Sequence, residues 1–141
     1  MAERFDAIVI GAGQAGPALC DRLDFQGLKT AIVERKLLGG TCVNVGCIPT
    51  KTLVGSARAI HMARRGGEYG FTAGDIRVDM QAVKARKDGV VKQSSEGLGS
   101  WIAGMKNVSL IRGHARFTAP RTLDVGGRPL QADRIFINVG G

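Results

Sequence analysis

Two cysteines near residue 45 have the types and spacing needed for redox chemistry. Cys42 and Cys47 lie five positions apart, immediately before a predicted helix. In a regular helix this spacing is an axial rise of ~7.5 Å, beyond the usual disulfide Cα separation of about 4.4–6.8 Å. A bond between them therefore needs a distorted turn, for which Gly46 provides backbone freedom. A thiol at a helix N-terminus also has its thiolate stabilised, as thiol–disulfide exchange requires.

A glycine motif near the N-terminus has the spacing of a dinucleotide-binding turn. Gly11, Gly13 and Gly16 form GxGxxG, and Glu34 follows 18 residues beyond the last glycine. The first glycine allows a tight turn, the second lets a pyrophosphate approach the backbone, and the third lets helix and strand pack closely. A helix N-terminus supplies free N–H groups, and Glu34 can accept hydrogen bonds from a ribose diol. The motif therefore predicts dinucleotide binding, although it does not separate FAD from NAD.

A βαβ unit must position these residues. The apolar run at 5–10 predicts a buried strand, and the run at 28–34 predicts the next one. The helix between them has Leu23 and Phe25 on its apolar side and ends at Gly27. Parallel strands joined by a helical crossover need both sheet faces covered, which agrees with the nearly continuous apolar runs.

Two longer helices and a set of short strands are predicted in the rest of the chain. One helix runs over 49–65 with Leu53 on its apolar side, and the other runs over 79–103 with Asp79 as its cap. Trp101 is expected in the core. The strands are predicted at 108–112, 115–118, 122–125, 129–131 and 134–139, with the middle three forming a meander. We therefore expect a single α/β unit.

The composition excludes several classes of protein. The 141 residues are 44% hydrophobic and contain no segment long and apolar enough to span a bilayer. The first residues lack the features of a secretory leader, so we expect a cytoplasmic protein. Residues 58–141 carry 14 Lys and Arg against 7 Asp and Glu. These cations have mixed spacing without interleaved aromatics, so we expect a solvated surface and no nucleic-acid partner.

The remaining cysteine and the histidines do not support a metal site. Zinc usually takes four nitrogen or sulfur ligands at recognisable spacing, and the cysteine pair with isolated His61 and His114 offers no second ligand pair. Cys20 lies four residues after Gly16 and is expected to pack as a small apolar residue. We therefore predict no bound metal.

The segment GGTCVNVGCIPTK at residues 39–51 resembles the active-site signature of the flavin-dependent pyridine nucleotide–disulfide oxidoreductases. This family includes dihydrolipoamide dehydrogenase, glutathione reductase and mercuric reductase. The glycine motif precedes the segment in the expected order, and weaker similarity continues to Gly141. The resemblance implies a Rossmann-like α/β FAD-binding fold, with a parallel sheet, helices and a small three-stranded β-meander. It further implies that residues 1–141 are the N-terminal part of an FAD-binding domain, incomplete relative to the family.

The resemblance also assigns roles to individual residues. Cys42 is expected to be the interchange thiol that faces the substrate, Cys47 the thiol beside the flavin, and Lys51 a residue near the flavin ring. The implied FAD-binding residues are Gly11, Gly13, Gln14, Ala15, Gly16, Glu34, Arg35, Gly40, Thr41, Lys51, His114, Ala115 and Gly140.

The implied activity passes electrons from NAD(P)H through FAD to the Cys42–Cys47 disulfide, and then to a small-molecule disulfide or related substrate. NAD(P)H is expected to bind in a domain that this chain lacks, and the parent enzyme is expected to be a homodimer. The chain alone is therefore expected to be inactive. CVNVGC is nearer the mercuric and glutathione reductases and IPTK nearer the lipoamide enzymes, so the substrate stays open. The alternative is a non-catalytic nucleotide-binding or partner-binding module.

Overall fold

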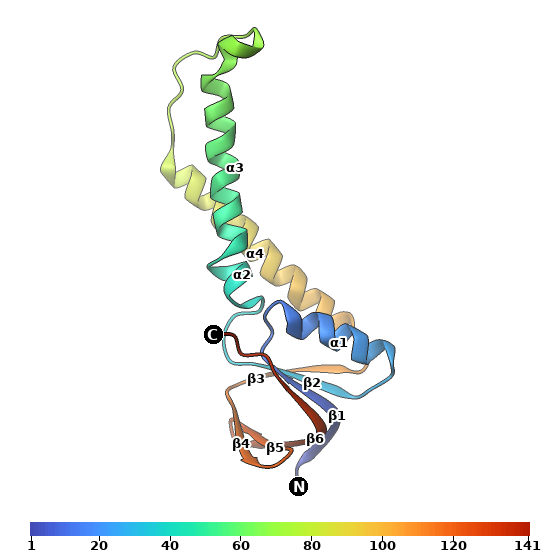
Figure 1. Cartoon of the computed structure of the whole chain (residues 1–141). Coiled ribbons are helices and arrows are strands. Elements are labelled where there is room, and N and C mark those ends of the chain that lie inside the picture. The colour runs from blue at the N-terminus through green and yellow to red at the C-terminus, as the bar shows by residue number, and fades with distance from the viewer.

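A six-stranded mixed sheet forms the body of the protein in the computed structural model, which describes residues 1–141 (Figure 1). The strands are β1 (Glu3–Ile10), β2 (Thr30–Glu34), β3 (Val108–Arg112), β4 (Ala115–Ala119), β5 (Thr122–Val125) and β6 (Arg128–Ile137). Their order is β3-β2-β1-β6-β5-β4, with β3, β2, β1 and β6 parallel and β6, β5 and β4 antiparallel. The predicted Rossmann-like α/β fold with a meander is confirmed.

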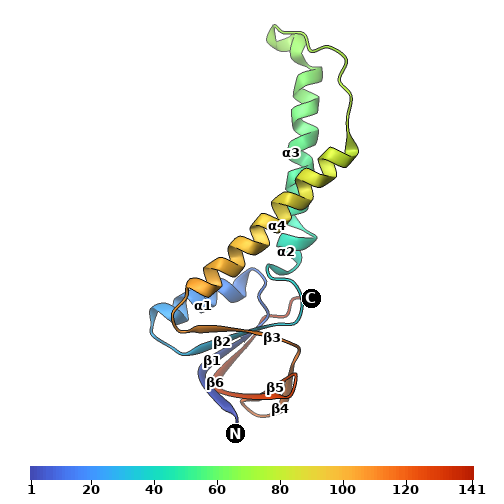
Figure 2. The ribbon, with the colours of Figure 1, turned by 180° about the vertical axis from the view of Figure 1, so that it is seen from behind.

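Both faces of the sheet are buried, which explains the continuous apolar run of β1. Ile8 packs with Val33 and Leu123 on one face, where the meander folds over the parallel strands. Val9 packs on the opposite face with Cys20 and Ile102. These last two residues belong to helix α1 (Ala15–Phe25) and helix α4 (Met80–Gly104), which lie across that face (Figures 1 and 2). Cys20 is fully buried and packs as predicted.

A single long strand replaces the two predicted at 129–131 and 134–139. The reason is β1, which pairs with β6 from Glu3 opposite Leu130 to Ile10 opposite Ile137. The first part of β6 also pairs with β5, so the meander and the parallel strands share β6. The meander is therefore continuous with the main sheet.

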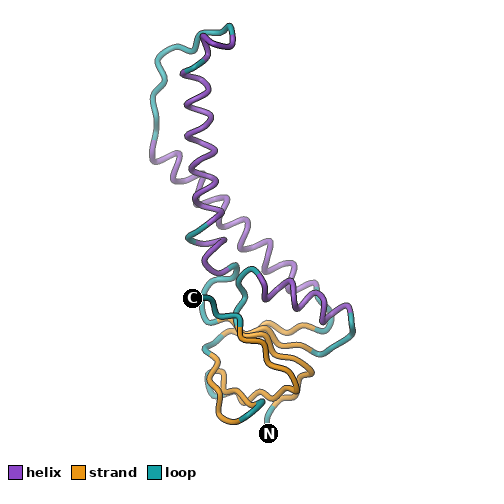
Figure 3. Tube along the Cα trace, in the orientation of Figure 1, coloured by secondary structure: helices purple, strands orange, loops and turns teal.

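A helical hairpin extends away from the sheet (Figures 1 and 3). It contains α2 (Gly40–Asn44), α3 (Cys47–Arg64), a 3₁₀ turn at Gly66–Tyr69, and α4. As predicted, Asp79 caps α4, because its Oδ1 accepts hydrogen bonds from the N–H groups of Gln81 and Ala82 at 2.9 and 3.0 Å. The 3₁₀ turn was not predicted.

Three predictions of apolar burial are wrong. Phe25 at the end of α1 is 89% exposed, Trp101 in α4 is 44% exposed, and Leu53 in α3 is 41% exposed. Leu53 is exposed because α3 extends away from the sheet. Phe25 and Trp101 belong to the two helices that lie across the sheet, but they lie on helix surfaces that the sheet does not cover, since the next residue after Trp101, Ile102, is the one that packs in the core. Thr52 is the one buried residue of α3, and Ile102 is the one buried residue of α4.

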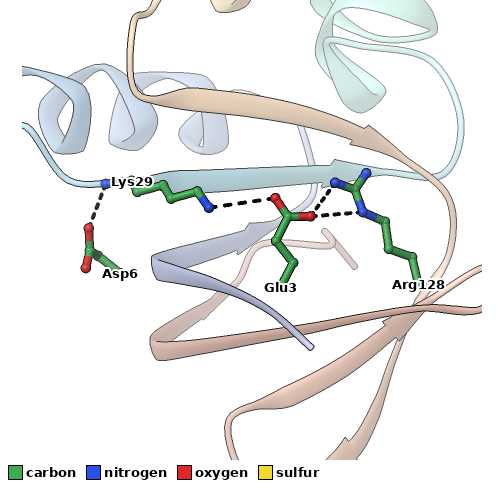
Figure 4. Close-up of polar contacts among 4 residues, drawn as sticks. All are labelled: Glu3, Asp6, Lys29 and Arg128. Carbon is green, nitrogen blue, oxygen red and sulfur yellow. Dashed lines mark hydrogen bonds and ion pairs between the residues drawn. The ribbon is translucent and has the colours of Figure 1, made fainter. Parts of the chain in front are cut away.

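A polar network links three strands at the amino edge of the sheet (Figure 4). The Glu3 carboxylate accepts a hydrogen bond from Nε of Arg128 at 3.1 Å and also pairs with the Arg128 Nη2. Nζ of Lys29 lies 3.7 Å from the same carboxylate, and the Lys29 N–H donates to Asp6 at 2.7 Å. The network therefore joins β1, β6 and the start of β2 at the edge opposite the glycine turn. None of the helices has the length and apolar character needed to cross a membrane.

Candidate functional site

The carboxyl ends of β1, β2 and β6 lie together at one edge of the sheet, because the three strands are parallel. Just past β1, Gly11 donates its N–H to the carbonyl oxygen of Val33 in β2 at 2.8 Å. Just past β6, Asn138 donates its N–H to the carbonyl oxygen of Ile10 at 2.8 Å. This edge therefore gathers the glycine turn, Glu34 and the C-terminal residues, and Figure 1 shows the chain end near the start of α1.

The three motif glycines lie in different surroundings. A Cβ at Gly16 would overlap the carbonyl oxygen of Gly11, so only glycine lets α1 pack this close to the turn. Gly11 has φ +106°, and a Cβ there would overlap the carbonyl oxygen of Asn138. At Gly13, in contrast, a Cβ would meet nothing within 4 Å. The first and third glycines thus serve packing, whereas the second leaves backbone accessible to a ligand.

The start of α1 and the start of α2 adjoin this accessible backbone. Gln14 is the N-cap of α1, and its side chain makes no capping hydrogen bond, so the N–H groups from Ala15 onward are free for an anion. A Cβ at Gly40 would lie 3.0 Å from the Cα of Gly13. Thr41 follows Gly40 and is exposed. The predicted phosphate-binding residues of two separate segments therefore lie side by side.

Glu34 lies at the end of β2 and organises the backbone around it. One carboxylate oxygen accepts a hydrogen bond from the Ala12 N–H at 2.9 Å, and the other accepts one from the Lys36 N–H at 2.7 Å. Each oxygen keeps a further lone pair for a ligand hydroxyl. Arg35 is exposed beside it.

The turn between β3 and β4 lies next to Glu34. The Gly113 N–H donates to the backbone carbonyl of Glu34 at 3.1 Å, which places His114 and Ala115 at the same edge. Gly140 follows β6 with φ +82°, a backbone conformation that favours glycine. The predicted FAD-binding segments that follow β1, β2, β3 and β6 thus lie at the carboxyl edge, and Lys51 lies in α3.

The two cysteines lie in separate helices. Cys42 is in the five-residue α2, and Cys47 is the first residue of α3, which begins two residues earlier than predicted. Between the helices, a Cβ at Gly46 would lie 2.9 Å from the carbonyl oxygen of Thr41 and 3.3 Å from the Cα of Cys42. Glycine is therefore required for α3 to begin against α2. The predicted distorted turn is present, and it brings the N-terminus of α3 to Cys42.

The two cysteines are thiols in this structure, and Cys47 influences the protonation of Cys42. The Cys47 side chain, chiefly as a hydrogen-bond partner, raises the pKa of Cys42 above its usual value, and desolvation and charge add to the effect. A backbone hydrogen bond from Cys47 opposes it. Lys51 lies one turn beyond Cys47 in α3, so it is on the same face of the helix and is exposed. The predicted redox pair and its lysine therefore lie together.

Two side chains that hydrogen-bond to the backbone near Cys42 were not predicted from the sequence. The Asn44 side-chain amide donates to the carbonyl oxygens of Leu38 and Gly40 at 2.9 and 2.8 Å. The Leu38 carbonyl oxygen also accepts a hydrogen bond from Oγ of Ser95 in α4 at 3.1 Å. The preference of asparagine for local bonds to backbone was a usable signal for Asn44. The sequence carried no signal for Ser95, because it lies 57 residues from Leu38.

A hollow of about 280 Å³ lies beside the glycine turn. Gly13 and Gln14 line one side, Val43 of α2 lines another, and Leu98 and Trp101 of α4 complete it. The exposed Trp101 side chain thus borders this hollow instead of the core. A second hollow, of about 460 Å³, lies at the far end of the hairpin and contains none of the predicted site residues.

A Rossmann-like sheet with a glycine turn and a nearby thiol pair at its carboxyl edge is the arrangement predicted for a dinucleotide-binding protein with a redox pair. Residues 5–141 match the family model described as pyridine nucleotide-disulphide oxidoreductase. The chain belongs to this family, as the signature at residues 39–51 predicted.

Similar proteins include oxidoreductases of two kinds. A dihydrolipoyl dehydrogenase of Thermus scotoductus is 39% identical over 136 residues, which cover 96% of this chain and 29% of that protein. One from Acholeplasma laidlawii is 30% identical over 141 residues, which cover 99% of this chain and 42% of that protein. The HOCl-induced flavoprotein disulfide reductase RclA from Escherichia coli has a similar structure, with a TM-score of 0.79 and 33% identity. That match covers 96% of this chain and 28% of RclA. The chain therefore spans less than half the length of these relatives.

Proposed function

We propose that this chain is the N-terminal, FAD-binding and redox-disulfide part of an NAD(P)H-dependent flavoprotein disulfide oxidoreductase. The observation that supports it most directly is the thiol pair: Cys47 begins α3 directly beside Cys42. A vicinal thiol pair at a helix N-terminus is suited to thiol–disulfide exchange. The membership in a family of oxidoreductases supports the same activity.

The carboxyl edge of the sheet fits an FAD molecule. The open side of Gly13 and the uncapped N-terminus of α1 suit the pyrophosphate, and Gly40 and Thr41 adjoin them. The Glu34 carboxylate suits the ribose diol of the adenosine. A bound flavin supplies two-electron chemistry that neither thiol nor backbone provides.

The cysteines have different tasks in the proposed reaction. Cys42 is the thiol that exchanges with substrate in this proposal, and it reacts as the thiolate. Because Cys47 raises the Cys42 pKa, this exchange needs a higher pH than that of a free cysteine. Cys47, the first residue of α3, is the thiol that lies beside the flavin in this proposal. Lys51 on the same helix face adds positive charge near Cys47. The pair as a whole gives up two electrons and two protons when it closes to a disulfide.

The substrate proposed is a small-molecule disulfide or a related electron acceptor. The chain has one GxGxxG motif, so NAD(P)H binding and homodimer formation are assigned to segments outside this chain. By itself the chain should not complete an NAD(P)H-driven cycle. The proposed compartment is the cytoplasm, where thiols are kept reduced and disulfides are usually transient and catalytic.

Visible absorption during stepwise reduction with a dithiol tests this proposal. The purified chain, with FAD added, should show flavin absorbance and then a long-wavelength band as the disulfide opens beside the ring. A Cys47→Ser variant should retain the flavin absorbance and lose the long-wavelength band. A chain that binds no FAD and shows no reducible Cys42–Cys47 bond would instead support the alternative, a non-catalytic binding module.

A further inference from the structure

We propose that Asn44 and Ser95 are positioning residues that hold Cys42 and Cys47 together through the shared carbonyl oxygen of Leu38. The inference rests on the proposed redox function of the thiol pair. It assigns a role to two residues that contact neither sulfur, one of them in a helix distant in sequence.

The helix that carries Cys42 depends on contacts outside itself. It has five residues, and helices this short are unstable on their own because nucleation is unfavourable. Its backbone bonds include those from the Val45 N–H to the Thr41 carbonyl at 2.9 Å and from the Val43 N–H to the Gly39 carbonyl at 3.4 Å, which span little more than one turn. The Asn44 amide adds two hydrogen bonds, which tie the end of the helix to its start and to the loop before it. Asn44 therefore holds the two ends of the segment at residues 38–44, which contains Cys42, close to one another.

Ser95 attaches the segment at residues 38–44 to helix α4. Its hydroxyl, half-buried in α4, donates to the same Leu38 carbonyl oxygen that accepts from Asn44. The Leu38 side chain is buried, and a Cβ at Gly99 would lie 3.3 Å from its Cδ1. Both the backbone and the side chain of Leu38 are thus fixed on α4. Helix α4 is also bonded to α3, which carries Cys47, because Arg86 donates to the Thr52 carbonyl oxygen at 2.9 Å. The contact at Leu38 therefore places the Cys42 segment on the same helix that holds α3.

Loosening the contact should make the disulfide harder to form. Closing the bond oxidises two thiols and releases two electrons and two protons, which glutathione disulfide accepts to become two glutathione thiols. The equilibrium depends on the effective concentration of one cysteine at the other, which fixed geometry raises. If Asn44 and Ser95 hold the thiols together, removing either donor lowers the equilibrium constant for disulfide formation.

The test measures this equilibrium constant in glutathione redox buffers at pH 7. The chain is equilibrated, its free thiols are alkylated after acid quenching, and the fraction with Cys42 and Cys47 joined is read from peptide masses. We expect the constant to fall about 3-fold in Ser95→Ala, which loses one hydrogen bond, and about 5- to 10-fold in Asn44→Ala, which loses two. Alanine has a higher helix propensity than asparagine, so an effect of local helix stability alone would not lower the constant.

Two matched variants control for general destabilisation. Ser100→Ala removes a hydroxyl of α4 that bonds within its own helix, to the Glu96 carbonyl. Asn107→Ala removes an amide that donates to the Asp24 carbonyl at the far end of α1. Both should leave the disulfide equilibrium within a factor of two of the parent chain.

The outcomes separate this inference from the proposed function. If the parent chain forms the disulfide and the Asn44 and Ser95 variants match it, or if the control variants fall as far, the positioning role is wrong. If the parent chain forms no Cys42–Cys47 disulfide in any buffer, the proposed redox function fails and the inference fails with it. If Asn44→Ala loses its far-ultraviolet circular dichroism signal, that variant is unfolded. The Ser95→Ala variant alone then tests the positioning role.

Discussion

The sulfur atoms of Cys42 and Cys47 are chemically unequal because of their places in the helices. Cys47 is the first residue of α3, whereas Cys42 lies in α2 and has its pKa raised by Cys47. The raised pKa means that the Cys42 proton stays on the sulfur to higher pH than in a free cysteine. A single interaction thus distinguishes two residues of the same type.

Removing Cys47 should therefore make Cys42 more acidic. In Cys47→Ala, the midpoint of the pH dependence of Cys42 alkylation should move to lower pH, because the hydrogen-bond partner that raises the Cys42 pKa is gone. Alkylation rates with iodoacetamide, followed by peptide mass, measure the midpoint. Cys20→Ala is the control and should leave it unchanged. An unchanged or higher midpoint in Cys47→Ala would show that the thiols do not interact.

The burial of Cys20 leads to a second prediction, which concerns the pH dependence of stability. Its burial raises the pKa of the thiol from 9.0 to about 12. Between these values the unfolded chain loses this proton and the folded chain keeps it, so stability is full below pH 9 and falls as pH rises. The loss is at most about 1.4 kcal/mol per pH unit.

Chemical denaturation from pH 8 to 11, with a reductant present, tests the Cys20 prediction. The stability advantage of the parent chain over Cys20→Ala should shrink as pH rises above 9. A stability difference that stays constant from pH 8 to 11 would contradict the raised pKa of Cys20.

At the scale of elements, a glycine can weaken a helix or can allow two elements to pack, according to its surroundings. Gly89 lies within α4, where a Cβ would meet nothing within 4 Å. Gly16 lies where α1 packs on the turn after β1, and a Cβ there would overlap backbone. One glycine only weakens its helix, whereas the other permits two elements to touch.

Alanine at these two positions should have effects of opposite sign. Gly89→Ala should stabilise the chain by about 0.5–1 kcal/mol, because alanine loses less conformational entropy in a helix. Gly16→Ala should destabilise it by more than about 2 kcal/mol, because backbone must move to accept the Cβ. Urea denaturation measures both. A loss of stability in Gly89→Ala, or a neutral Gly16→Ala, would contradict the packing described here.

At the scale of the whole molecule, the sheet is tied at its amino edge and exposes its site at the opposite edge. The hydrogen bond from Arg128, with further charge from Arg128 and Lys29, lowers the pKa of Glu3, and partial desolvation opposes the shift. A lowered carboxyl pKa contributes stability that is present above the unfolded value of 4.5 and lost as pH falls through the folded value. The network thus stabilises the sheet without touching the thiol site.

Glu3→Gln should lower the free energy of unfolding by less than about 1 kcal/mol at pH 7, because the Glu3 side chain is 36% exposed and solvent weakens the pairs. The difference from the parent chain should vanish at pH below the folded pKa. Thermal unfolding at pH 7 and pH 3 checks this. The Cys42–Cys47 equilibrium should not change, and a change would show that the two edges are coupled.

The sequence alone determined the βαβ unit, the glycine turn and the cysteine pair, because these depend on local periodicity, special backbone positions and short spacing. Gly11, Gly16 and Gly46 each lie where the backbone permits no Cβ, which motif spacing is able to reveal. It also determined the family, through the signature at residues 39–51 and its order after GxGxxG.

The tertiary structure decided what depends on contacts between distant segments. The continuity of β6 comes from its pairing with β1, more than 120 residues away. The exposure of Trp101 comes from the way α4 lies on the sheet, with Ile102 in the core and Trp101 at the hollow beside the glycine turn. The bond from Ser95 to Leu38 likewise joins residues that no local pattern relates. Local patterns specify which residues form an element, but packing decides which faces are covered and which donors reach the site.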